Sequence, residues 1–248
     1  LTPDNKQAYY NRGLAKINIK DYESALDDFN ALIALTKKYP DAYFQRGYAR
    51  ELLEQPERAI DDYSRTISLQ KGDMRAYKSR GMLRSQLKRY KLALSDFDKA
   101  IKLDPNDKSL YVNRGDIFMA MNNPDEAIDN YQQAIGIDRK YALAYAKRGL
   151  GKMTEKNYKG ALTDFNQALR LDKEHKLSYI YRAKVYAALS KYEKAIDDYS
   201  QALTIDSNYV DAYYERGNLN YWLKNYDTAI TDFNKAIKIQ PRNKDAYY

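Results

Sequence analysis

Several residue types that support covalent cross-links or metal chemistry are scarce in this chain of 248 residues or missing from it. It contains no cysteine, which excludes disulfides and thiolate metal sites. The only histidine, His175, falls in a predicted turn, so neither a histidine metal cluster nor a histidine-based catalytic triad is expected. We therefore expect a protein that is not an enzyme and that needs no cofactor.

Long apolar runs are also absent. No run approaches the roughly 18 residues that a membrane-spanning helix needs, and charged residues make up 31% of the chain. The sequence thus predicts a soluble chain without a transmembrane helix, and it assigns no compartment. No linker or low-complexity tract interrupts residues 1–248, so a single domain is expected.

A 34-residue pattern fills the chain instead, without an insertion or a deletion. One slot of the pattern holds Gly13, Gly47, Gly81, Gly115, Gly149, Ala183 and Gly217. A second slot holds alanine in every copy, from Ala25 to Ala229, and an aromatic residue follows it by four positions. Within each copy the apolar slots fall at helical spacing. A fixed period in this range is typical of a solenoid of stacked repeats.

The residues in these slots resemble the tetratricopeptide repeat, whose signature is Trp-x2-Leu-Gly-x2-Tyr, then Ala-x3-Phe, then Pro. In the last copy the matching residues are Tyr213, Arg216, Gly217, Ala229, Phe233, Ala236 and Pro241. The resemblance covers residues 6–243 and implies an all-α fold, a right-handed α-solenoid of seven helix-turn-helix repeats. These repeats span 6–39, 40–73, 74–107, 108–141, 142–175, 176–209 and 210–243. The family carries over no enzyme activity.

The two ends of the sequence look like parts of further repeats. Leu1-Thr2-Pro3-Asp4-Asn5 matches the closing residues of a copy, and Asp245-Ala246-Tyr247-Tyr248 matches the opening of one. We interpret 1–5 and 244–248 as partial repeats, and the chain as a fragment of a longer array.

An arginine stands in every copy where the family has leucine. These arginines are Arg12, Arg46, Arg80, Arg114, Arg148, Arg182 and Arg216. Sixteen residues later stand Asp28, Asp62, Asp96, Asn130, Asp164, Asp198 and Asp232. Each copy thus offers a cation and, on the paired helix, a hydrogen-bond acceptor. The pattern predicts a structural ion pair inside each repeat, with Arg114–Asn130 as the weaker member. The alternative is a ladder of arginines that binds phosphates.

The net charge of +8 is concentrated in the third repeat. The stretch from Lys71 to Lys102 holds ten basic residues against three acidic ones, a balance of +7. Such a patch suits an acidic or phosphate-bearing partner. The competing interpretation is an ordinary solvated face.

The family's geometry implies that a set of apolar and aromatic residues on the first helices faces a concave groove. This set is Tyr10, Phe44, Tyr48, Met82, Val112, Met119, Leu150, Met153, Ile180, Tyr214, Tyr221 and Trp222. Exposed side chains of these types favour docking of a peptide or helix. In the same groove Arg75 and Lys78 are expected to hold an acidic group of the ligand. The competing interpretation for each apolar residue is packing between adjacent first helices.

These patterns together predict a protein–protein interaction scaffold whose groove binds a peptide or helix of a partner protein. One alternative is RNA or single-stranded nucleic acid bound through the basic third repeat, although the confinement of charge to one repeat counts against it. Another alternative is a regulatory or targeting arm of a larger protein. The family's peptide-carboxylate clamp is incomplete, because Met82 stands where its paired asparagine would be. The sequence does not fix an oligomeric state.

Overall fold

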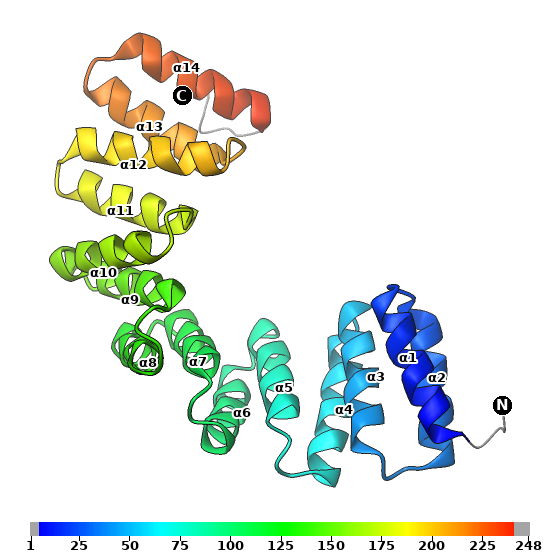
Figure 1. The fold of residues 1–248 in the computed structure, drawn as a ribbon. Coiled ribbons are helices and arrows are strands. Elements are labelled where there is room, and N and C mark those ends of the chain that lie inside the picture. The colour runs from blue at the N-terminus through cyan, green and yellow to red at the C-terminus, as the bar shows by residue number, and fades with distance from the viewer. Residues whose placement is uncertain (1–4, 241–248) are drawn as a thin grey trace. The chain divides into compact units, whose positions relative to one another are not determined.

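The computed structural model describes residues 5–240, and these residues form 14 helices and no strand (Figure 1). The chain divides into two compact units, Leu1–Met121 with helices α1 to α7 and Asn122–Tyr248 with helices α8 to α14. The all-α fold predicted from the repeat pattern is confirmed for the described residues. The partial repeat expected at 244–248 lies outside them, as do Pro241 and residues 1–4.

Helix starts recur every 34 residues, because each copy of the sequence pattern folds into the same two helices. The first helix of a copy has 13 residues and begins at the first residue of the expected repeat. These first helices are α1 (Lys6–Asn18), α3 (Pro40–Leu52), α5 (Met74–Gln86), α7 (Lys108–Ala120), α9 (Ala142–Thr154), α11 (Lys176–Ala188) and α13 (Val210–Trp222). The second helices, of 14 residues, are α2 (Tyr22–Leu35), α4 (Pro56–Leu69), α6 (Tyr90–Leu103), α8 (Pro124–Ile137), α10 (Tyr158–Leu171), α12 (Tyr192–Ile205) and α14 (Tyr226–Ile239).

The turn between the two helices of a copy is closed by backbone hydrogen bonds around a left-handed residue that is never glycine. In the first copy Lys20 has a φ of 63°. The N–H of Asp21 donates to the carbonyl of Lys16 at 2.9 Å, and the N–H of Lys20 donates to that of Ile17 at 2.9 Å. Two carbonyls at the helix end are thereby satisfied. The left-handed residues of the seven copies are Lys20, Glu54, Lys88, Asn122, Lys156, Ser190 and Lys224.

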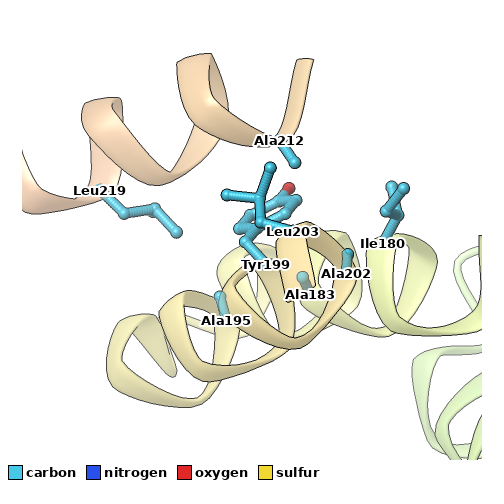
Figure 2. Packing of buried hydrophobic residues seen from close by; sticks show 8 residues of the cluster. All are labelled: Ile180, Ala183, Ala195, Tyr199, Ala202, Leu203, Ala212 and Leu219. Atoms are coloured by element: carbon cyan, nitrogen blue, oxygen red, sulfur yellow. The ribbon is translucent and has the colours of Figure 1, made fainter. Parts of the chain in front are cut away.

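The core is built from small residues packed against aromatic rings. The ring of the second helix lies against the glycine or alanine slot of the first helix, as Phe165 does against Gly149. Figure 2 shows one such cluster, which joins α11, α12 and α13. Its buried members are Ile180, Ala183, Ala195, Tyr199, Ala202, Leu203, Ala212 and Leu219. Each buried ring contributes about 1.5–3 kcal/mol through the hydrophobic effect, so these clusters hold neighbouring helices together.

Each arginine of the predicted ion pairs donates to the buried aspartate of its own repeat wherever both residues lie in one unit. The pairs are Arg12–Asp28, Arg46–Asp62, Arg80–Asp96, Arg148–Asp164, Arg182–Asp198 and Arg216–Asp232, with nitrogen–oxygen distances of 2.5 to 2.6 Å. Both Nε and Nη2 donate, as they do in Arg182 at 2.8 and 2.6 Å. This two-point geometry fixes the guanidinium plane. The bridge between Arg114 and Asn130 stays a prediction.

Six of the seven arginines also bond the preceding repeat, a contact that was not predicted from the sequence. Nη1 of Arg182 donates to Asn166 of α10 at 2.6 Å. An equivalent bond joins every two consecutive repeats, and its acceptor always lies sixteen residues before the arginine. The acceptors are Asn30, Ser64, Asp98, Gln132, Asn166 and Ser200. The guanidinium of Arg182 therefore connects three helices. In the sequence, this contact is marked by an oxygen-bearing side chain sixteen residues before the arginine.

A second cation reaches the buried aspartate in four of the repeats. Nζ of Lys16, one turn after Arg12, lies 2.9 Å from Asp28. The equivalent cations are Arg50, Arg84 and Lys152. In the sixth and seventh repeats this slot holds Tyr186 and Asn220. Among the described residues, the aspartates of these two repeats therefore have one cationic partner each.

The pKa values of two of these aspartates, Asp28 with two cationic partners and Asp198 with one, move in opposite directions. Burial alone would raise the pKa of Asp28, but the hydrogen bonds and charges of Arg12 and Lys16 outweigh burial and lower it. Burial raises the pKa of Asp198, because the single guanidinium of Arg182 does not offset it.

Gly149→Ala should destabilise the protein, because the added methyl would lie 2.7 Å from the ring of Phe165. The expected loss is about 1–3 kcal/mol in the free energy of unfolding, measured by urea denaturation followed by circular dichroism. Gly136→Ala is the control, since nothing lies within 4 Å of its added methyl. It should gain about 0.5–1 kcal/mol, because alanine favours the helix. Equal effects of the two substitutions would contradict this packing.

Asp28→Asn should lower the free energy of unfolding by about 1.5–3 kcal/mol at neutral pH, where the carboxylate accepts charged hydrogen bonds. This loss should shrink as the pH falls below about 4, because the wild-type carboxyl then also becomes protonated. Asp198→Asn should show the opposite slope, since the raised pKa of Asp198 makes its ionisation less favourable in the folded state. The loss of unfolding free energy caused by Asp198→Asn should therefore grow towards acid pH.

Urea denaturation between about pH 3 and pH 6 would measure both slopes. Asp27→Asn is the matched control, because Asp27 is adjacent to Asp28 but exposed. Parallel pH profiles for Asp28→Asn and Asp198→Asn would contradict the proposed effect of the second cation.

Candidate functional site

Three of the aromatic residues predicted to face a partner rest on the rings of the core. The ring of Tyr10 lies 6.3 Å from that of Phe29, and Phe44 lies 5.4 Å from Tyr63, measured between ring centroids. Tyr214 packs on the corresponding ring of α14 at 6.2 Å. All three are half-buried. They therefore pack on the core with one side of each ring and present only part of each ring to solvent.

Two further members of the predicted set belong to the core. Ile180 is 2% exposed and lies in the cluster of Figure 2, and Val112 is also buried. A ligand cannot contact them without moving helices apart, so for these two residues the prediction of a groove contact is wrong and helix packing is the correct interpretation. Met119, Leu150 and Met153 are half-buried.

The remaining members are exposed. Tyr48 of α3 and Met82 of α5 are 40% and 39% exposed in the first unit. In the second unit, Tyr221 and Trp222 at the end of α13 are 59% and 77% exposed. Apolar side chains with this degree of exposure can contact a ligand without a rearrangement of the helices. These four side chains are thus the part of the predicted set that is available to a ligand.

Two residues of α14, the last helix of the described residues, are exposed as well. The ring of Tyr226 contacts that of Tyr221 edge-on, with centroids 5.7 Å apart, and Ile230 is exposed. We call Tyr221, Trp222, Tyr226 and Ile230 the aromatic patch. Residues of the same type in the same slots of the sixth repeat, Tyr192 and Ile196, are half-buried because they pack on the cluster that joins α11, α12 and α13.

The two cations that were predicted to hold an acidic group of the ligand, Arg75 and Lys78, already bond carboxylates of the protein. Nη2 of Arg75 lies 2.8 Å from Asp41 and 2.7 Å from Asp73, and the guanidinium lies 4.7 Å above the ring of Phe44. The hydrogen bonds that Arg75 donates to Asp73 and Asp41 raise the pKa of its guanidinium. Nζ of Lys78 donates to Asp107 at 3.0 Å and to Ser109 at 2.6 Å. An acidic ligand would have to compete with these carboxylates.

The histidine and the acidic residues do not gather into a metal site within residues 5–240. These residues contain no group of three or more His, Asp or Glu side chains that would hold a metal ion. The ring of His175 caps α11, where Nδ1 accepts from the N–H of Ser178 at 3.3 Å. Burial lowers the pKa of this imidazole. The histidine therefore has a structural role.

Within the described part of the chain, none of the helices combines the length and the apolar character that crossing a membrane requires.

Three models of tetratricopeptide repeats match the sequence. One, described as a TPR repeat, matches residues 115–151 and 183–224. Two described as tetratricopeptide repeats match 75–107 with 210–243, and 10–73. A search of curated proteins found no significant match.

Solved structures share the fold at low sequence identity. The C-terminal part of a TPR repeat-containing protein from Cytophaga hutchinsonii has a TM-score of 0.77 and 20% identity, covering 96% of this chain and 98% of that one. A tetratricopeptide repeat protein from Parabacteroides merdae has a TM-score of 0.77 and 17% identity, covering 98% and 96%. YrrB, described as a TPR protein with an unusual peptide-binding site, has a TM-score of 0.59 and 22% identity, covering 76% and 97%.

The repeat signature, the recurring helices and the matching family models agree with one another. The chain belongs to the tetratricopeptide repeat family.

Proposed function

We propose that this protein is an interaction scaffold and that the exposed side chains of its first helices bind a peptide or helix of a partner protein. The observation that carries the proposal is the exposure of Trp222 and Tyr221 side by side on α13. Tryptophan and tyrosine are enriched among the residues that contribute most to protein–protein affinity. Their position favours an apolar anchor residue in the ligand.

The helix that carries these two aromatic residues is held rigidly. Arg216, also on α13, donates to Asp232 of α14 at 2.6 Å and to Ser200 of α12 at 2.8 Å. Two neighbouring helices thus fix the position of α13. A preformed surface loses little conformational entropy on binding, which supports a role as a docking platform. Tyr48 and Met82 offer a smaller exposed surface of the same kind in the first unit.

The class of ligand is supported by a structural relative. YrrB, whose fold this chain shares over 76% of its length, is described as having a peptide-binding site. We place the main contribution to affinity on apolar contacts, because Arg75 and Lys78 already bond carboxylates of the protein. We propose a binding protein, with no catalytic role for the residues of the first helices.

The test uses peptides selected from a random phage-displayed library against the intact chain. Tyr221→Ala/Trp222→Ala should weaken the selected peptides roughly 30-fold or more, as expected when residues that dominate an interface are truncated. Fluorescence anisotropy of labelled peptide would measure the affinity. Trp222 is the only tryptophan, so its emission should shift to shorter wavelength when a peptide displaces water from the indole.

A double variant on second helices serves as the control. Leu92→Ala/Ile205→Ala removes exposed apolar side chains from α6 and α12 and should leave the affinity unchanged. Peptides that bind both double variants equally well, or that leave the emission of Trp222 unchanged in the wild-type protein, would refute binding at α13.

A further inference from the structure

In the third repeat the arginines are paired with carboxylates, whereas most of the lysines are not. Between Lys71 and Lys102 every arginine, and Lys78 as well, has a carboxylate within salt-bridge distance. These residues are Arg75, Lys78, Arg80, Arg84 and Arg89. Five lysines remain, and among the described residues none of them forms an ion pair or a side-chain hydrogen bond. They are Lys71, Lys88, Lys91, Lys99 and Lys102. The uncompensated charge of the repeat is therefore carried by exposed lysines alone.

Three of these five lysines line one cleft. Lys71 enters it from the turn after α4, and Lys99 and Lys102 enter it from the second half of α6. Tyr77 of α5 and Leu103 complete the lining of this cleft of about 360 Å³. No carboxylate lines it. We call it the lysine cleft. Three uncompensated ammonium groups around one cavity repel one another, and an anion placed among them would relieve that repulsion.

The same arrangement occurs again four repeats later. A cleft of about 480 Å³ is lined by Ser207, Asn208, Tyr213, Lys235, Lys238 and Ile239. Tyr213, Lys235 and Lys238 occupy the slots of Tyr77, Lys99 and Lys102, while Ser207 replaces Lys71. Here too, neither lysine has an ion-pair partner among residues 5–240.

Paired lysines at these slots are not a general property of the repeat. In the seven copies the first slot holds Ala31, Arg65, Lys99, Gln133, Gln167, Gln201 and Lys235. The second slot holds Ala34, Ser68, Lys102, Gly136, Arg170, Thr204 and Lys238. The fifth repeat also forms a cleft, but its lining includes Asp164, which is bonded to Arg148. Only the third and seventh copies combine both lysines, and both of these copies form a cleft.

We propose that the lysine cleft binds a dianionic phosphate monoester, and that the equivalent cleft of the seventh repeat binds the same group more weakly. A phosphate monoester carries a charge of about −1.5 to −2 at neutral pH, which matches two or three ammonium groups. Lysine binds phosphate as a point charge and does not need a fixed fork of donors. Tyr77 and Leu103 offer an apolar wall to the group that carries the phosphate.

The chemistry favours a monoester over a nucleic-acid backbone. A strand of phosphodiesters needs a continuous series of cations, whereas the arginines beside the cleft are neutralised by carboxylates. The cleft is lined by residues of α5, α6 and the turn before α5, and it shares no residue with the exposed aromatic residues Tyr48, Tyr221 and Trp222. Substitutions in the cleft therefore test phosphate binding separately from peptide binding at α13.

The test is a titration of the intact chain with phenyl phosphate at constant ionic strength, followed by isothermal calorimetry and by the NMR signals of Tyr77. Lys99→Gln/Lys102→Gln should weaken binding about tenfold or more, because charge-assisted hydrogen bonds are lost. Lys88→Gln/Lys91→Gln removes the same charge from the same repeat outside the cleft and should leave the affinity unchanged. Affinity should also fall as the pH drops below about 6, where the monoester loses its second charge.

Four outcomes would overturn the proposal. They are equal weakening in the two double variants, binding of phenol as tight as that of phenyl phosphate, absence of a pH effect around the second phosphate pKa, and no detectable binding. A short single-stranded RNA without terminal phosphates that binds more tightly than phenyl phosphate, and loses affinity in Lys99→Gln/Lys102→Gln, would assign the cleft to nucleic acid instead. Lys235→Gln/Lys238→Gln should remove only the weaker of two binding events.

Discussion

In five of the seven repeats one guanidinium connects the first helix to two second helices, and this contact fixes how the three helices pack. Arg182 bonds Asp198 of its own repeat and Asn166 of the repeat before it. A buried ion pair carries a desolvation cost, so its net value depends on complete hydrogen bonding. Here Nε, Nη1 and Nη2 all have acceptors. The small residue one position later, Ala183, lets the ring of Tyr199 pack beneath the same helix. Charge and packing thus specify one relative placement of the helices.

The sequence specified the repeat much better than it specified the exposed surface. Period and slot composition predict where each first helix begins, because every copy obeys the same local rules. The pairing of Arg182 with Asp198 was also readable, since both slots recur in step. Exposure was harder to predict. Ile180 and Trp222 are both apolar residues on first helices, yet one is buried and the other is 77% exposed. The difference depends on how neighbouring helices pack, which a single repeat does not encode.

Basic residues in this protein serve two different purposes. Arginine offers several donors in a fixed plane, so it suits sites where two or three acceptors converge, as at Arg80 with Asp96 and Ser64. Lysine is a mobile point charge, and the lysines of the two clefts have no ion-pair partner among residues 5–240. The high positive charge of the third repeat therefore overstates its attraction for a polyanion, because five of its ten cations are already neutralised. This division could not be inferred from counting charges, since several of the acceptors come from neighbouring repeats.

The missing second cation in the last two repeats has a consequence for how the stack opens. In repeat proteins, stability is roughly a sum of local and nearest-neighbour contributions, so segments with weaker contributions open more often than the rest. Among the residues that the structure describes, Asp198 and Asp232 have no equivalent of the additional partner that Lys16, Arg50, Arg84 and Lys152 supply elsewhere. We therefore expect the repeat that carries Trp222 to have a lower local unfolding free energy than the repeats in which two cations bond the aspartate. A ligand bound there would raise that free energy, and amide hydrogen exchange in α11 to α14 would slow as the site fills.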